Sequence, residues 1–190
     1  MALTRAAIVE AGLNLLDDYG LADLTMRRVG DALGVKAGAL YYHVPNKQSL
    51  LAAVADAILA EQEVPDADLP PDAWLTAWAI TLRETLLRHR DAAELIASSM
   101  ALGLGQIDPR ALGRRHLTAT GLDAETAAAL MRALLHLVLG QVMEEQTRRQ
   151  MVDLGLAGED ILDDYDAQFR FAVSLLIRGA SQLVSADQPT

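Results

Sequence analysis

Apolar residues recur along most of this chain at the spacing of an α-helix, and no stretch alternates between apolar and polar as a strand does. Near the N-terminus, Ile8, Ala11 and Leu15 fall on one helical face. Thr4 is placed to cap the start of that helix, and Gly20 to end it. The pattern therefore predicts an all-α protein with about nine helices.

Three further helices are expected in the first third of the chain. Thr25 is a good cap for the second helix, which ends at Gly34. The third runs over about 36–43, because the proline that follows at position 45 prevents its continuation. Asn46 then caps the fourth.

A stretch rich in proline and aspartate, residues 64–73, predicts a bend or short linker between two functional regions. Asp72 is expected to cap a helix that ends near His89, and a shorter helix follows over 91–102. The Asp-Pro pair at 108–109 is a start signal for the next helix, because proline suits the first helical position.

The last two predicted helices differ from the others in their apolar surface. One, capped by Asp123, runs over 124–151 and is apolar nearly all round, and the other spans 160–184 with a broad apolar stripe. A helix that is apolar all round must be buried on more than one side. In a chain this small, a second copy of the chain is the natural cover.

The charge distribution is informative, because the net charge of -10 looks unsuited to nucleic acid. Residues 1–47 carry five basic and five acidic side chains, so the whole acidic excess lies from residue 48 onward. Four of those five basic residues fall within 27–47. A local basic patch on a neutral module is enough to contact phosphates.

Other features narrow the class of protein. The chain has no cysteine, which excludes disulfides and thiolate chemistry. Its start lacks the pattern of a secretion signal. The most apolar run, 127–143, is interrupted by polar side chains and is shorter than the roughly 20 residues of a membrane span. We therefore expect a cytoplasmic protein.

Residues 24–47 have the features of a helix-turn-helix, whose second helix enters the major groove of DNA. Gly34 suits the turn, and the small residues 37–39 allow the backbone to approach the bases. The rings of 41–43 can donate to phosphate oxygens or pack on sugars. Lys47 begins the next helix, where free N–H groups already favour a phosphate.

The run from Thr25 to Lys47, Thr-Met-Arg-Arg-Val-Gly-Asp-Ala-Leu-Gly-Val-Lys-Ala-Gly-Ala-Leu-Tyr-Tyr-His-Val-Pro-Asn-Lys, resembles the signature of the tetracycline-repressor (TetR) family. The shared features are the Leu-Thr start, an Arg two residues after the Thr, the Gly-Val turn, the Leu-Tyr-x-His end and the final Asn-Lys. Residues 136–146, His-Leu-Val-Leu-Gly-Gln-Val-Met-Glu-Glu-Gln, are also similar to the penultimate helix of the C-terminal domain in that family.

The resemblance implies a transcriptional repressor: a homodimer that binds a palindromic DNA operator and is released by a small-molecule effector. It divides the chain into a helix-turn-helix DNA-binding domain at 1–47 and an effector-binding and dimerisation domain at 48–190, whose first helix, 48–63, links the two. By position, the expected DNA contacts are Thr25, Arg27, Lys36, Gly38, Tyr41, Tyr42, His43 and Lys47. Tyr41, His43 and Lys47 are expected at phosphates, and Lys36 and Gly38 nearest the bases.

The chain departs from the family pattern at two positions. Many members have Ser or Thr where this chain has Lys36, and that residue caps the recognition helix. Lysine cannot cap, so we expect a different helix start and base preference. Met26 replaces a common small polar residue, so one contact to DNA is expected to be missing.

An effector pocket is predicted from aromatic and sulfur-containing positions in the C-terminal region. The candidates are Trp74, Trp78, Leu82, Ile96, Met100, His136 and Met143. Rings and methionines would form an apolar, adaptable wall, and the histidine could supply one hydrogen bond. Ordinary core packing is the alternative for each residue.

The resemblance also bears on the effector. It aligns Ile96 and Glu63 with two histidines that bind magnesium and drug in the tetracycline repressor. We therefore expect an effector more apolar than a magnesium–tetracycline chelate. No cofactor is expected, and the four histidines lack metal-ligand spacing.

Other functions stay open at this point. The first is a DNA-binding activator or architectural protein that needs no ligand. The second is a helical enzyme that carries a helix-turn-helix, although no acid–base or metal constellation supports it. The third is a dimerisation module, or a plain helical hairpin, without DNA binding, which the localised basic residues disfavour.

Overall fold

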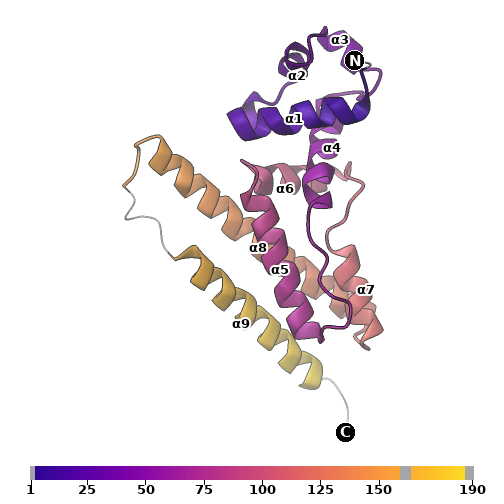
Figure 1. Ribbon diagram of the computed structural model, residues 1–190. Helices are drawn as coiled ribbons and strands as arrows, with labels where there is room; N and C mark the ends of the chain where they lie inside the picture. The colour runs from indigo at the N-terminus through magenta and orange to yellow at the C-terminus, as the bar shows by residue number, and fades with distance from the viewer. Residues whose placement is uncertain (1–2, 159–163, 187–190) are drawn as a thin grey trace. The chain divides into compact units, whose positions relative to one another are not determined.

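A computed structural model describes residues 3–158 and 164–186. Within these residues it contains nine α-helices, one 3-10 turn and no strand, which confirms the predicted all-α class (Figure 1). The helices up to the linker are α1 (Arg5–Tyr19), α2 (Met26–Ala32), α3 (Ala37–Leu40) and α4 (Lys47–Ala60), with the 3-10 turn η1 at Leu21–Asp23. The others are α5 (Pro71–Leu87), α6 (Ala92–Leu102), α7 (Ala111–Ala119), α8 (Ala124–Asp153) and α9 (Tyr165–Ala186).

The predicted N-terminal caps are confirmed by their hydrogen bonds. The Thr4 hydroxyl accepts from Ala7 N at 3.1 Å, and Asn46 Oδ1 accepts from Ser49 N at 2.8 Å. Asp123 Oδ1 accepts from two backbone N–H groups at the start of α8. These side chains satisfy donors that a helix leaves unpaired in its first turn, which is why the helices begin there.

Two predicted helix starts are wrong, and a third lies outside the described residues. α5 begins at Pro71, so Asp72 lies inside its first turn instead of capping it. α7 begins at Ala111 and not at Pro109, because the Pro109 carbonyl accepts from Trp78 Nε1 at 3.2 Å and stays outside the helix. The start expected for the last helix at residue 160 lies outside the described residues, and α9 begins at Tyr165.

The chain forms two compact units. The first contains Met1–Gln62 and Thr85–Asp108, and the second contains Glu63–Glu84 and Pro109–Thr190. Packing thus groups α4 and α6 with the first three helices, and α4 contacts both α1 and α6. The predicted boundary at residue 47 separates residues that contact DNA from those that do not, and it is not a boundary between packing units. It stays a prediction.

The first unit has a core drawn from all of its early helices. Side chains with no exposed surface include Ile8, Leu16, Leu24, Val29 and Leu50. Burying large aliphatic side chains stabilises a fold by about 1.5–3 kcal/mol each. This core fixes the position of α2 and α3 relative to α1 and α4.

Two aspartates in the first unit bind backbone far away in the sequence. Asp91, at the start of α6 with φ +53, accepts from Leu21 N at 2.8 Å. Asp56 of α4 accepts from Gln106 N and Ile107 N, each 2.9 Å from its Oδ1. The 3-10 turn and the segment after α6 are therefore tied to this unit by side chains.

The second unit is built around α8. α8 contacts α7 and α9, and its buried residues include Met131, Leu134 and Val138 (Figure 1). By length and composition α8 could cross a membrane, as the core helix of a soluble protein also could. Its buried side includes the carboxylate of Glu145, which is paired with arginine.

Candidate functional site

The turn between α2 and α3 requires glycine at two positions. Gly34 has φ +67, a left-handed conformation that favours glycine. Val35 N donates to Gly30 O at 2.9 Å, so the chain closes back onto α2. A Cβ on Gly30 would lie 2.9 Å from Val35 O and 3.1 Å from Ala37 N. Glycine at position 30 therefore permits the close approach of α2 to the start of α3.

The exposed face of α3 carries the predicted DNA contacts. Lys36 is exposed at the N-cap, and its side chain makes no capping bond, which confirms that lysine does not cap here. Gly38 is exposed, and apart from its chain neighbours and the backbone of its own helix no described atom lies within 4 Å of where its Cβ would be. A surface that is open at its N-terminal end can come close to base edges.

Aromatic rings follow directly after α3. Tyr41 is 50 % exposed and Tyr42 is 90 % exposed, high values for large rings. His43 packs edge-on against Tyr42 with 5.1 Å between ring centroids. Lys47 begins α4 directly after its Asn46 cap. Exposed rings and a lysine at a helix start are groups that can contact phosphates and sugars.

The two adjacent arginines of α2 have different environments. Arg28 is paired with Asp23, and its guanidinium lies 4.1 Å from the centroid of the Tyr19 ring. Arg27 has an 89 % exposed side chain and only a loose contact, 3.9 Å, with Asp31. Arg27 is therefore available to an outside anion, whereas Arg28 stabilises the unit.

Two other positions in α2 have structural roles. The Thr25 hydroxyl accepts from Arg28 N at 3.3 Å, so its oxygen is occupied as a helix cap. Met26 is buried, with 7 % of its surface exposed, and packs into the core. The expectation of a missing contact at Met26 stays a prediction, and burial gives this methionine a packing role.

A buried histidine joins three segments of the first unit. His89, just after α5, has Nδ1 at 3.0 Å from Asp17 Oδ2 of α1 and Nε2 at 3.1 Å from Glu61 Oε2 at the end of α4. The hydrogen bond from His89 is the main reason that the pKa of Glu61 lies below its usual value, with its charge and Arg88 adding to the effect. The histidine therefore links α1 to the end of α4.

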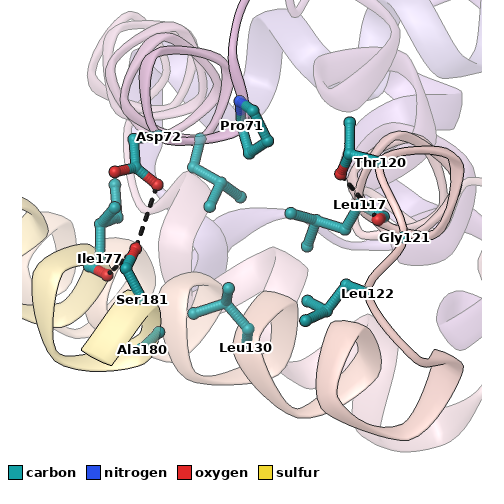
Figure 2. A pocket seen from close by; sticks show the side chains of 11 residues that line it. Pro71, Asp72, Leu117, Thr120, Gly121, Leu122, Leu130, Ile177, Ala180 and Ser181 are labelled. Carbon is teal, nitrogen blue, oxygen red and sulfur yellow. Dashed lines mark hydrogen bonds between the residues drawn. The ribbon is translucent and has the colours of Figure 1, made fainter. Parts of the chain in front are cut away.

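The predicted effector-pocket residues are divided between the two units. Ile96 and Met100 belong to the first unit, and the other five belong to the second. Trp74 is buried and stacks on His116 with 4.9 Å between centroids, while Trp78 donates to Pro109 O. Leu82 and Ile96 are buried, Met100 is half-buried, and His136 and Met143 are exposed. None of them lines the pocket of Figure 2, and all stay predictions.

That pocket has a volume of about 270 Å³ and lies among α5, α7, α8 and α9, within the second unit (Figure 2). Its apolar wall consists of Leu75, Leu117, Leu122, Leu130, Ile177 and Ala180 beside Pro71. Its polar side chains are Asp72, Thr120 and Ser181. Figure 2 shows the Asp72 carboxylate facing the Ser181 hydroxyl, 3.3 Å away.

Comparison with known proteins gives two family matches. Residues 8–54 match the family of bacterial regulatory proteins called tetR, and residues 69–163 match the tetracyclin repressor-like C-terminal domain. Tetracycline repressor protein class E of Escherichia coli is 34 % identical over 147 residues, which cover 76 % of this chain and 69 % of that protein. The chain belongs to the tetR family.

Solved structures of tetR-family proteins share the whole fold. BioQ with its natural double-stranded DNA operator has a TM-score of 0.81 and 36 % identity, covering 94 % of this chain and 98 % of BioQ. A single-residue variant of TetR from Acinetobacter baumannii AYE, in complex with minocycline, has a TM-score of 0.81 and 31 % identity, covering 96 % of this chain and 98 % of that one. These relatives are DNA-binding regulators, and none of their names is that of an enzyme.

Sequence reasoning missed Gly30, His89 and the pocket of Figure 2. Gly30 could have been found from the sequence, because a glycine inside a short helix lowers helix stability and is expected only where another segment must come close. His89 had none, since its partners Asp17 and Glu61 lie far away in the sequence. The pocket wall consists largely of leucines, which the sequence cannot distinguish from core residues.

Proposed function

We propose that this tetR-family protein is a repressor that binds a palindromic operator as a homodimer, acts in the cytoplasm, catalyses no reaction and is released from DNA by a small-molecule effector. The observation that carries the proposal is the exposed surface at α3. There, Lys36, Gly38 and two tyrosines, all within residues 36–42, are exposed. A relative of similar fold was solved with its DNA operator, which supports the same role for α3.

Dimerisation is supported by apolar side chains on the last two helices. Phe171 and Leu175 of α9 are 70 % and 63 % exposed, and Met143 and Met151 of α8 are 37 % and 40 % exposed. Large apolar side chains that gather on helices of a bundle mark an interface. A two-fold dimer would present two α3 helices, which read half-sites about 34 Å, or a multiple of that distance, apart.

Effector release is supported by the minocycline complex of a relative and by the pocket of Figure 2. In this chain Ile96 is buried and apolar, and Glu63 is exposed. Neither is a metal-binding histidine, so the effector is proposed to be other than a magnesium–tetracycline chelate. The DNA-binding part is 1–47, and the rest of the chain provides the effector and dimer functions.

An electrophoretic mobility shift with the DNA upstream of the protein's own gene tests DNA binding. The full chain is expected to shift one specific fragment and to need higher concentrations after Tyr42→Ala, since this exposed ring packs on no core residue. Glu125→Gln, an exposed position of α8, serves as the control. Loss of binding in the control alone, or unchanged binding in Tyr42→Ala, would contradict the role assigned to α3.

A reporter gene behind the same upstream fragment tests the direction of regulation. Repression predicts higher expression when the gene for this protein is deleted. Lower expression would favour an activator, the alternative function that needs the same DNA contacts.

A further inference from the structure

The polar side chains of the pocket in Figure 2 all present hydrogen-bond acceptors to it (Figure 2). Thr120 Oγ1 donates its single proton to Leu117 O at 2.9 Å. Ser181 Oγ lies 3.1 Å from Ile177 O and 3.3 Å from Asp72 Oδ1, so its proton goes to one of these two oxygens. An ionised carboxylate such as Asp72 accepts and does not donate.

The carbonyl end of one helix at the pocket favours a positively charged ligand. α7 ends at Ala119, so its carbonyl end, with partial negative charge, borders the pocket at Thr120 and Gly121. The start of α5 has the opposite polarity, but Asp72 in its first turn already supplies an anion there. Among the lining residues that the structure describes there is no lysine, arginine or histidine, and Arg178 lines the neighbouring groove instead.

The size and remaining walls of the pocket limit the rest of the ligand. Ligand sites usually have volumes of about 300–1,000 Å³. At about 270 Å³ this pocket takes a molecule with one ring or a short chain. Its leucines and Ile177 would cover an apolar body. A ligand with a carboxylate, phosphate or other anion would be repelled by the Asp72 carboxylate and by the negative ends of the other acceptors, so its binding is disfavoured.

We propose that this pocket binds a small organic amine. The apolar body lies against Leu117 and Leu130, and the protonated amine donates to Asp72, with the hydroxyl oxygens of Thr120 and Ser181 as further acceptors. The proposal rests on the proposed function in one respect, that the bound amine is the effector that releases DNA. The binding chemistry itself depends on the pocket alone.

Three probes of matched shape test the charge preference: phenylbutylamine, phenylbutanol and phenylbutyrate. Isothermal titration of the full chain is expected to give about tenfold tighter binding for the amine than for the alcohol, because charge-assisted hydrogen bonds are the stronger ones. Phenylbutyrate is expected to bind more weakly than the alcohol. Equal or tighter binding of phenylbutyrate, or no binding of the amine, overturns the proposal.

Variants locate the binding in this pocket. Asp72→Asn is expected to reduce the affinity for the amine to that for the alcohol. Glu125→Gln, which removes an acid from the first turn of α8 outside the pocket, is the matched control and should change neither. Ala180→Phe places a ring in the cavity and should weaken all three probes. Equal effects of Asp72→Asn and Glu125→Gln overturn the assignment.

The two proposals fail in distinguishable ways. Mobility shift without any probe tests the regulator function by itself. A chain that prefers the amine through Asp72 but shifts no DNA contradicts the proposed function and leaves the pocket chemistry standing. A chain that shifts DNA but prefers phenylbutyrate contradicts only the amine site. If phenylbutylamine releases DNA from the original chain but not from Asp72→Asn, both proposals are supported, because the amine then acts as the effector through this pocket.

Discussion

Arg83 Nη2 lies 2.8 Å from Glu145 Oε2, and the two side chains are only 11 % and 2 % exposed. The same guanidinium approaches Asp166 Oδ1 at 3.5 Å and lies 5.1 Å from the centroid of the Phe169 ring. One side chain of α5 thus contacts both α8 and α9. Glu145 also accepts from Arg149, so this buried carboxylate faces two cations.

Removing Arg83 is expected to destabilise the second unit strongly. Breaking a buried pair by deleting one partner typically costs about 3–5 kcal/mol, because a charge stays buried without compensation. Arg83→Met should lower the free energy of unfolding by about that amount in urea denaturation. Arg148→Met, which breaks an exposed pair with Glu144, should cost about 1 kcal/mol or less. Equal losses in both variants would contradict a special role for the buried pair.

Stability is expected to fall at acid pH through Glu61. Because His89 donates to it, the pKa of Glu61 is lower in the folded protein than its ordinary value of 4.5. Its contribution is therefore fully present above about pH 4.5 and is lost as the pH falls through the lowered folded pKa. The free energy of unfolding of Glu61→Gln should be lower than that of the original chain near neutral pH, and the difference should shrink in acid. A difference that is constant with pH would show that this carboxyl does not act by ionisation.

Adding one methyl group at Gly30 should disrupt the helix-turn-helix. The new Cβ would press on Val35 O and Ala37 N, backbone atoms that cannot rotate away. Overpacking of this kind costs about 1–3 kcal/mol, so Gly30→Ala should melt at a lower temperature and bind DNA poorly. Gly38→Ala enters open space and has the better helix propensity, so its melting temperature should not fall, while its DNA affinity should change. Thermal unfolding followed by circular dichroism, with a mobility shift, separates the two.

The salt dependence of DNA binding should report the phosphate contact proposed for Lys47. Losing one phosphate contact reduces the slope of log affinity against log salt concentration by about 1 and weakens binding to all sequences alike. Lys47→Ala should show both effects in fluorescence anisotropy. Arg178→Ala removes the same charge from α9 and should leave the slope unchanged. A slope that drops equally in both would indicate a general charge effect.

A charge on the exposed face of α9 should separate the proposed dimer. Phe171→Glu leaves the single chain intact, because the ring is 70 % exposed there. In a dimer it would bury a carboxylate without a partner, which is strongly unfavourable. Sedimentation velocity should show half the mass for this variant, and the dimer mass for Val64→Glu, a change at an exposed position in the linker. A dimer that survives Phe171→Glu would place the interface elsewhere.

Local signals explain why much of the fold could be predicted. The caps at Thr4, Thr25 and Asn46 depend on residues only three positions away, so a single sequence contains all the information. The start of α7 depends instead on Trp78, which binds Pro109 O from a position 31 residues earlier. The Asp-Pro pair has the form of a helix start, but the helix begins two residues later, where the Pro109 carbonyl is bound by a distant side chain.

The candidate site shows the same limit. Tyr42 and Lys36 were proposed as DNA contacts from their positions in the helix-turn-helix motif, and the structure shows that both are exposed, while their contact with DNA stays a prediction. The pocket role of Asp72 was not predicted, since an acidic residue at a helix start is usually a cap, whereas here Asp72 lies inside the first turn and lines a pocket. Trp74 shows the opposite difficulty. A large ring can be taken for a ligand contact when it only packs in the core, because large rings are buried in cores as often as at ligands.

The bonds from Asp56 to Gln106 N and Ile107 N limit how α4 can move. Both bonds lie within the first unit, so Asp56 holds the segment after α6 against α4. A displacement of α4 within this unit must carry residues 106 and 107 with it or break bonds worth about 1 kcal/mol each. Motion of the helix that follows the DNA-reading surface thus has a mechanical resistance, set by one aspartate.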